Sequence, residues 1–198
     1  MPSVVPDELH LVESFANSLD VETAQDDLDS ASRFGRWLTA HGFPDIEPDD
    51  DELALATAVR DALRAELTVH HDRGFSGEAR TRLDGYAARI PLRVAFRPDG
   101  PATLVPAGSG VVAMLGAVLA EMVLAEREGD WHRLKICPEE TCRRVFFDRS
   151  KNQSKTWCSM RACGNRNKTR TYRGRQRGLP VPPPSLTPPA PPAPLKPR

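Results

Sequence analysis

The chain has 198 residues, of which 27 are Lys or Arg and 27 are Asp or Glu, so its formal net charge is zero. This length accommodates one domain of ordinary size plus a small appendage. The first ten residues, MPSVVPDELH, lack the basic and apolar regions of an export signal. We therefore expect a cytoplasmic protein with reduced cysteines rather than a secreted disulfide scaffold.

Helical signals recur through the first 130 residues. Ser30 or Ser32 can cap a helix that ends at Gly42. Leucine and valine spaced four residues apart predict a second helix from Asp51 to about Val69. Apolar residues around Leu83 indicate a shorter third helix.

The pattern then changes to that of a hairpin. Residues 92–96 alternate, Pro98-Asp99-Gly100 forms a turn, and residues 102–105 return. The next stretch, Val111–Ala125, is apolar apart from one glycine and one glutamate. It is shorter than the roughly 20 residues that span a bilayer. We expect a buried central helix, no membrane partner, and an α+β, mostly helical front domain over residues 1–130.

A glycine motif raises one enzymatic alternative. Residues 108–113, GSGVVA, fit G-x-G-x-x-A between a predicted strand and a predicted helix, which is the setting of a dinucleotide fingerprint. The acidic residue that such a site needs about 20 residues later, at the end of a second parallel strand, is missing. A glycine-rich turn is the simpler interpretation, with a small-ligand or anion site as the alternative. No catalytic constellation is evident, and we expect no enzyme.

The four cysteines of the chain form two pairs, Cys137-x4-Cys142 and Cys158-x4-Cys163, separated by fifteen residues. Two short hairpins that each present two thiolates suit tetrahedral Zn²⁺. Four thiolates close the coordination sphere, so the ion would be structural and could not activate a water molecule. His132 is close to the first pair, but a complete thiolate set makes a fifth ligand unnecessary.

Charge is distributed very unevenly along the chain. Residues 1–130 contain 24 acidic and 11 basic side chains, whereas residues 131–178 contain 14 basic and 3 acidic ones. Such asymmetry is typical of proteins that bind a polyanion. The two parts should also attract each other, so the acidic part could compete with DNA for the basic part.

The cationic segment predicts a nucleic-acid interface. A short helix is expected from about Gly164 to Gly174, with Arg166, Arg170 and Arg173 on one face, suited to phosphates or the major groove. The predicted contact residues share a basic or amide side chain: Arg143, Arg144, Arg149, Lys151, Lys155, Arg161, Asn165, Arg166, Lys168, Arg170, Arg173 and Arg175. DNA is the favoured partner. RNA, or an acidic protein bound by a zinc-stabilised module without sequence-specific DNA binding, remains the alternative.

The last twenty residues, 179–198, contain ten prolines and predict a disordered, extended tail. The expected organisation is thus a front domain over 1–130, a small four-cysteine zinc finger over 131–178, and the tail. No heptad or interface pattern fixes an oligomeric state.

Two stretches resemble known bacterial families. Cys163-Gly164-Asn165-Arg166, with the cysteine spacings and the run FFDRS at 146–150, is similar to the CGNR zinc finger. Residues 15–20, FANSLD, and Trp37-Leu38 followed by Gly42 resemble the ABATE-type domain that precedes this finger in proteins described as stress-induced transcription regulators. The resemblance implies zinc and DNA binding for the finger. It implies a sensory role, with a small-molecule effector, for the front domain of a nucleoid-associated regulator.

Overall fold

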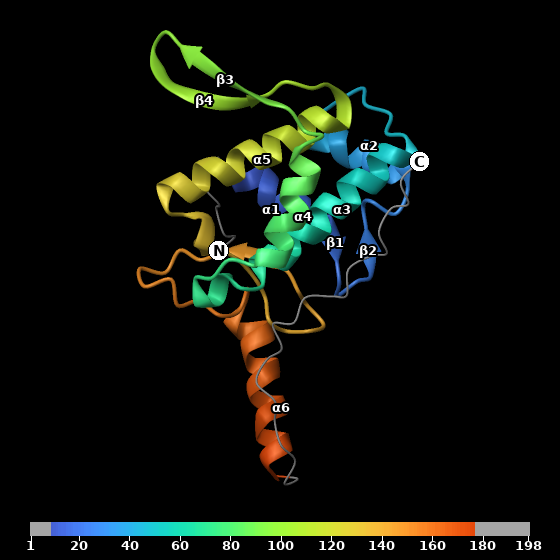
Figure 1. The fold of residues 1–198 in the computed structure, drawn as a ribbon. Helices are drawn as coiled ribbons and strands as arrows, with labels where there is room; N and C mark the ends of the chain where they lie inside the picture. The colour runs from blue at the N-terminus through green and yellow to red at the C-terminus, as the bar shows by residue number, and fades with distance from the viewer. Residues whose placement is uncertain (1–8, 177–198) are drawn as a thin grey trace.

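The computed structural model describes residues 9–176 (Figure 1). The tail prediction for 179–198 falls outside these residues. The described elements, in chain order, are α1 (His10–Ala16), β1 (Leu19–Asp20), β2 (Gln25–Asp26), α2 (Ala31–Ala40), α3 (Asp50–Leu67), η2 (His70–Asp72), α4 (Gly77–Ala87), β3 (Leu92–Arg97), β4 (Gly100–Pro106), α5 (Gly110–Glu128), η3 (Trp131–Arg133), β5 (Leu134–Ile136), β6 (Val145–Phe147), the π-helical turn η4 (Met160–Gly164) and α6 (Asn165–Gln176). The strands form three two-stranded antiparallel sheets, β1-β2, β3-β4 and β5-β6.

Local sequence signals explain where the front helices begin. Ser30 accepts a hydrogen bond from Arg33 N and caps α2, as predicted. At the start of α3, Asp49 and Glu52 form a capping box, in which each side chain accepts from the other residue's backbone amide. The acidic residues of the first turn lie where the helix dipole favours negative charge. The α+β, mostly helical class predicted from the sequence is confirmed.

Helix α5 lies at the centre of the front part and contacts α1, α3 and β4. It buries Val111, Met114, Leu115 and Val118, as its apolar sequence predicted. Glu121, the acidic residue in the middle of α5, binds the N-terminal end of α1. Its carboxylate accepts a hydrogen bond from Val12 N at 3.3 Å. No helix within residues 9–176 is long and apolar enough to cross a membrane.

The front part and the start of the cysteine-rich part share one hydrophobic core. The cluster that contains Phe15 and Leu115 also contains Trp131, Leu134 and Val145. Trp131 and Leu134 are 1% and 0% exposed, so the core does not stop at the predicted boundary at residue 130. A second, small cluster packs Phe146 and Trp157 around the cysteines. The β5-β6 hairpin therefore has one side in the main core and leads at its ends into the cysteine loops.

Helix α6 projects from the rest of the molecule (Figure 1). Within the described residues its main contacts are with η4, the turn from which it continues. At the other end of the view, the β3-β4 hairpin extends over α5 (Figure 1).

Candidate metal centre and nucleic-acid interface

The structure brings the four cysteine sulfurs together. All four Sγ atoms lie within 4.8 Å of one another. Two of the separations are 3.6 Å, between Cys142 and Cys158, and 3.7 Å, between Cys158 and Cys163. Sulfurs at about 2.3 Å from a tetrahedral zinc ion would be about 3.8 Å apart. The cysteines are free rather than paired in disulfides, so the donor set fits the metal that the spacing predicted.

The first cysteine pair lies on a tight turn between β5 and β6. Cys142 N and Arg143 N both donate to the Glu139 carbonyl, at 2.9 and 3.0 Å, and Cys137 N donates to the Arg144 carbonyl at 2.8 Å. Arg143 has φ of 50°, a left-handed conformation that a non-glycine residue adopts at some cost. The turn folds the chain back so that both sulfurs point to the same place.

The second pair spans the start of η4. Ser159 caps this turn by accepting from Ala162 N at 3.2 Å, and Gly164 N donates to the Ser159 carbonyl at 3.1 Å. A Cβ at Gly164 would overlap the sulfur of Met160 and lie 3.3 Å from Trp157 Cδ1. Gly164 thus packs closely against the side chains of Met160 and Trp157, and the exposed thioether of Met160 would have to move to admit a larger residue.

The four sulfurs are close enough to perturb one another's ionisation. Hydrogen bonds from Cys137 and Cys158 lower the pKa of Cys142 to about 2. Burial, together with the charge of Cys137, raises the pKa of Cys163 to about 12. The pKa of Cys158 is also raised, through its hydrogen bonds with Cys137 and Cys142. Four adjacent thiolates cannot all ionise unless a cation neutralises them, so the site is electrostatically suited to a divalent soft metal ion.

A buried ion pair organises the loop between the cysteine pairs. Lys135 Nζ lies 2.7 Å from Asp148 Oδ2, and these two residues are 2% and 0% exposed. Asp148 also accepts from Ser150 N and Lys155 N, each at 2.9 Å. Burial raises the pKa of Asp148, but the hydrogen bonds from Lys135 and Ser150 outweigh it and lower the pKa below its usual value. The carboxylate stays ionised and fixes the loop.

Four side chains of the front part reach the backbone of the finger. Asn17 pairs with Val145 through two hydrogen bonds, Nδ2 to the carbonyl at 3.0 Å and Val145 N to Oδ1 at 2.8 Å. Arg64, which is 4% exposed, donates to the carbonyls of Ala16 at 2.5 Å and of Arg143 at 3.0 Å. Burial lowers the pKa of Arg64 to about 10.

The two histidines that follow α3 complete this contact. His70 Nδ1 donates to the Leu134 carbonyl at 2.6 Å, and His71 Nε2 donates to the Ile136 carbonyl at 2.8 Å. Burial lowers the pKa of His71. Sequence reasoning missed all four contact residues, because their partners are backbone groups far away in the chain.

The structure places most of the predicted nucleic-acid residues at the surface. Arg143 and Lys155 are partly buried, and the others are exposed: Arg144, Arg149, Lys151, Arg161, Asn165, Arg166, Lys168, Arg170, Arg173 and Arg175. Lys155 Nζ lies 4.9 Å from the centre of the Phe146 ring, and so it is used in part for packing.

Two arginines of α6 are held by carboxylates of the protein itself. Arg170 Nη1 lies 2.9 Å from Glu139 Oε1, and Glu139 is fully buried. Arg166 donates to Thr141 Oγ1 at 2.8 Å and to Glu22 Oε1 at 2.9 Å. Glu22 belongs to the turn between β1 and β2, so this pair links the acidic front part to the basic helix. It is a specific contact of the kind that the opposite charges of the two parts predicted.

A different face of α6 remains open. Lys168, Tyr172 and Arg175 follow the spacing i, i+4, i+7 and therefore share one face. All three are exposed, with Tyr172 65% exposed, and neither Lys168 nor Arg175 has a carboxylate partner within residues 9–176. Two arginines of the predicted face thus form ion pairs within the protein. The face with Lys168, Tyr172 and Arg175 is more available to an external partner.

Comparison with known proteins agrees with the geometry. Residues 133–176 match the model of the CGNR zinc finger family. Residues 9–126, more than half of the chain, match the ABATE family model, described as "Putative stress-induced transcription regulator". The chain belongs to this family and carries a CGNR zinc finger behind the family domain, as the resemblance indicated. No curated protein matches the chain.

Proposed function

We propose that the protein is a transcription regulator whose zinc-loaded finger binds duplex DNA through α6. The observation that carries the proposal is a twelve-residue helix that projects from the body with five Lys or Arg and no acidic residue. A single helix of this kind fits the major groove, where Arg and Lys reach guanine edges and phosphates.

The metal in this proposal is Zn²⁺, bound by Cys137, Cys142, Cys158 and Cys163. Its role is structural, because four thiolates leave no position for a substrate or water molecule. Zinc binding contributes on the order of 10 kcal/mol to the folding of such modules. The residues Lys135 and Asp148 then fix the loop, and η4 fixes the start of α6. In this view the protein is not an enzyme.

The face of α6 defined by Lys168, Tyr172 and Arg175 is the one that we assign to DNA. Arg166 holds the helix against Glu22 of the front part, and Arg170 holds it against Glu139 of the finger. The cations on the open face would neutralise phosphates, while the Tyr172 ring offers an apolar contact to a base or a thymine methyl group.

The test is a salt titration of DNA binding with the zinc-loaded protein. Each neutralised phosphate contributes about −0.9 to the slope of log K against log salt. The double variant Lys168→Gln with Arg175→Gln should weaken binding and make the slope less negative by about 1.8. Arg89→Gln with Arg127→Gln, two exposed arginines elsewhere, removes the same charge and should leave the slope unchanged. Equal effects of both double variants would contradict the assignment.

Specificity for DNA requires a second measurement. Selection from a random duplex library should enrich particular sequences, and competition with structured RNA and single strands should leave duplex DNA preferred. If no sequence is enriched, or if RNA displaces the duplex DNA, the alternative is favoured, namely a zinc-stabilised module that binds RNA or protein.

We also propose that the front domain senses a small molecule in the cytoplasm. A cleft of about 580 Å³ lies where α1 meets the cysteine loops, and it also reaches three of the cysteines. Its charged lining comes from both sides, with Glu13 on the front part and Arg144 and Lys155 on the finger. Glu22 also lines the cleft, but it already pairs with Arg166. A zwitterionic ligand would complement these charges. Thermal-shift screening with free amino acids, repeated on Glu13→Gln, tests the site, and the absence of any ligand-dependent shift would contradict it.

A further inference from the structure

The four cysteines differ in how far solvent can reach them. Cys137, Cys142 and Cys163 are 0%, 6% and 3% exposed. Cys158 is only partly buried. It lies just before η4 and lines the cleft of about 580 Å³ at the junction of α1 and the cysteine loops. A small dissolved molecule can therefore reach Cys158 through this cleft.

Cys158 also has two other sulfurs close to its own. Its Sγ lies 3.6 Å from that of Cys142 and 3.7 Å from that of Cys163. Cysteines that bind a metal are deprotonated, and the thiolate is the nucleophilic form of the side chain. An accessible thiolate with a second thiolate beside it is the arrangement of redox-sensitive cysteines. The arrangement around Cys158 therefore favours oxidation to a disulfide.

Two cations line the same cleft. Arg144 is exposed and Lys155 is partly buried. The Nζ of Lys155 lies 4.9 Å from the centre of the Phe146 ring, and this ring packs in the small core around the cysteines. Of the two carboxylates in the lining, one is already paired with a basic residue of α6, and the other, Glu13, lies on α1. Positive charge near Cys158 would stabilise a hydroxide that leaves during attack on a peroxide.

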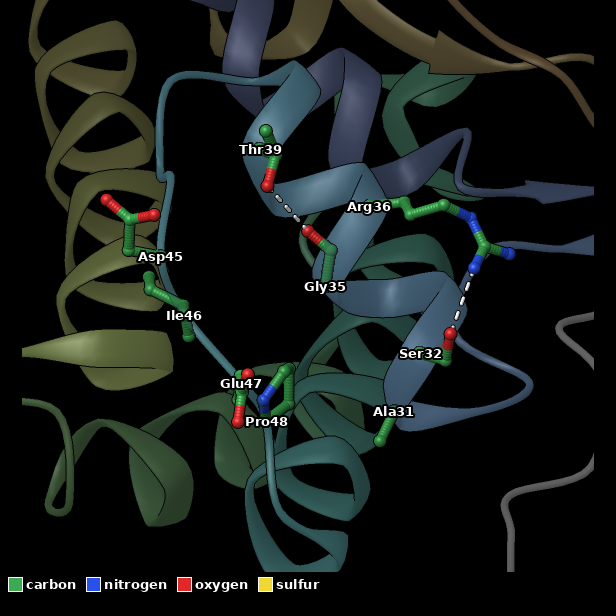
Figure 2. Close-up of a pocket in the computed structure, with 9 residues that line it drawn as sticks. All are labelled: Ala31, Ser32, Gly35, Arg36, Thr39, Asp45, Ile46, Glu47 and Pro48. Atoms are coloured by element: carbon green, nitrogen blue, oxygen red, sulfur yellow. Dashed lines mark hydrogen bonds between the residues drawn. The ribbon is translucent and has the colours of Figure 1, made fainter.

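A second cleft, of about 760 Å³, offers no such chemistry. It lies between α2 and the segment 45–48 (Figure 2). Polar side chains of its α2 wall bind groups of the same helix. Arg36 donates to Ser32 Oγ at 2.9 Å, and Thr39 Oγ1 donates to the Gly35 carbonyl at 3.1 Å (Figure 2). No cysteine is among the residues that line this cleft. The nucleophilic side chains thus lie in the cleft beside the metal centre.

We propose that Cys158 is a site of oxidation by hydrogen peroxide, and that its oxidation releases the metal from the finger. The Cys158 thiolate attacks one oxygen of the peroxide, the O–O bond breaks, hydroxide leaves and the sulfur becomes a sulfenic acid. The thiolate of Cys142 or Cys163 then attacks this sulfur, forms the S–S bond and displaces a second hydroxide. In sum, two thiolates and one peroxide give one disulfide and two hydroxides.

The consequence for the finger follows from the ligand set. A disulfide that includes Cys158 removes two of the four thiolates, so the site no longer closes around the metal. Cys163 lies in η4, the turn that continues into α6, and the start of this helix loses a fixed point when the metal leaves. The proposal depends on the metal at the four cysteines. It depends neither on DNA binding nor on a small-molecule ligand of the front domain.

The test adds hydrogen peroxide to the zinc-loaded full chain and follows two quantities in the same samples. A chromogenic chelator records the zinc that is released, and mass spectrometry with a sulfenic-acid trap maps the cysteines. We expect trapped sulfenic acid on Cys158, a first disulfide that includes Cys158, and one zinc ion released per disulfide. Dithiothreitol and added zinc should restore the metal content. A first disulfide without Cys158, zinc retained after oxidation, or no reaction would each overturn the proposal.

Two lysines of the loop between the cysteine pairs provide matched variants, each checked for full zinc content before peroxide is added. Lys155→Gln removes a cation from the cleft lining, and Lys151→Gln removes the same charge at an exposed position outside it. Zinc release should slow about threefold to tenfold in Lys155→Gln, because the leaving hydroxide loses a stabilising charge. It should keep the wild-type rate in Lys151→Gln. Equal rates in the two variants would contradict attack within the cleft.

A methionine variant separates cysteine oxidation from the oxidation of a neighbouring thioether. Met160 lies on η4 and is 50% exposed, so peroxide can also reach its sulfur. Met160→Leu should release zinc at the wild-type rate and give the same first disulfide. Slower zinc release in Met160→Leu would assign the effect of peroxide to methionine oxidation instead.

Discussion

Asn17 provides the sharpest test of how the front domain holds the finger. Its side-chain amide makes two hydrogen bonds to the backbone of Val145, which is 0% exposed. Val145 pairs with Ile136 in the β5-β6 hairpin, and the neighbouring hydrogen bond runs from Cys137 N to the Arg144 carbonyl. The N–H and C=O of Val145 therefore point away from β5, and Asn17 takes the place of a third strand.

The size of the effect follows from these two bonds. Replacing Asn17 with Ala leaves one buried N–H and one buried C=O without their partners, and each costs about 1–3 kcal/mol. Asn17 itself is only partly buried, so water can replace some of the loss. We expect Asn17→Ala to lower the free energy of unfolding by about 2–3 kcal/mol. With a urea m-value of about 2 kcal/mol/M, the midpoint should fall by about 1–1.5 M.

The assay is urea unfolding of zinc-loaded protein, followed by tryptophan fluorescence and by far-ultraviolet circular dichroism. Asn152→Ala, at an exposed position in the loop between the cysteine pairs, is the matched control and should remain within about 0.5 kcal/mol of wild type. If Asn17→Ala also remains within that range, the amide does not carry the contact and the reasoning is refuted.

Three further outcomes are expected. Burial lowers the pKa of the His71 imidazole, so the unfolded state takes up a proton first as pH falls below about 6.5. The free energy of unfolding should therefore fall as the pH is lowered below about 6.5, and it should fall less steeply in His71→Gln, both proteins being saturated with zinc. Urea midpoints of the two proteins that change in parallel with pH would contradict this. Glu22→Gln releases Arg166 and should tighten DNA binding about twofold to fivefold by fluorescence anisotropy, whereas weaker binding would show that the pair assists recognition. Removal of zinc by a chelator should lower the unfolding temperature of the whole chain, measured by calorimetry, because Leu134 and Val145 belong to the front core. A front domain that still unfolds at the temperature of the zinc-loaded protein would contradict this.

Short-range features of the molecule were predictable from the sequence. Ser30 caps a helix, and the stretch 111–125 is buried, because caps and apolar patterns act within a few residues. The cysteine spacing likewise anticipated the sulfur cluster. Family resemblance added the order of the two modules, which the matches at 9–126 and 133–176 confirm.

The contacts between the modules were not predictable. Arg64 and His70 donate to carbonyl groups, and every residue has a carbonyl, so nothing in the sequence marks the partner. The helix-face argument grouped Arg166, Arg170 and Arg173 correctly by spacing, but it could not anticipate that Glu22 and Glu139 hold two of them. Those carboxylates come from other parts of the chain, and only the fold brings them near.

Because the hydrophobic core is continuous across residue 130, the chain should not be cut there into two separately expressed fragments. A fragment cut at this point would expose Trp131 and Leu134 to water, and the other fragment would retain the buried guanidinium of Arg64 without one of its two acceptors. Both pieces would tend to aggregate. The two modules should therefore be inherited, expressed and recombined as one unit, and a chimaera that exchanges only the finger should need the matching surface of its new neighbour.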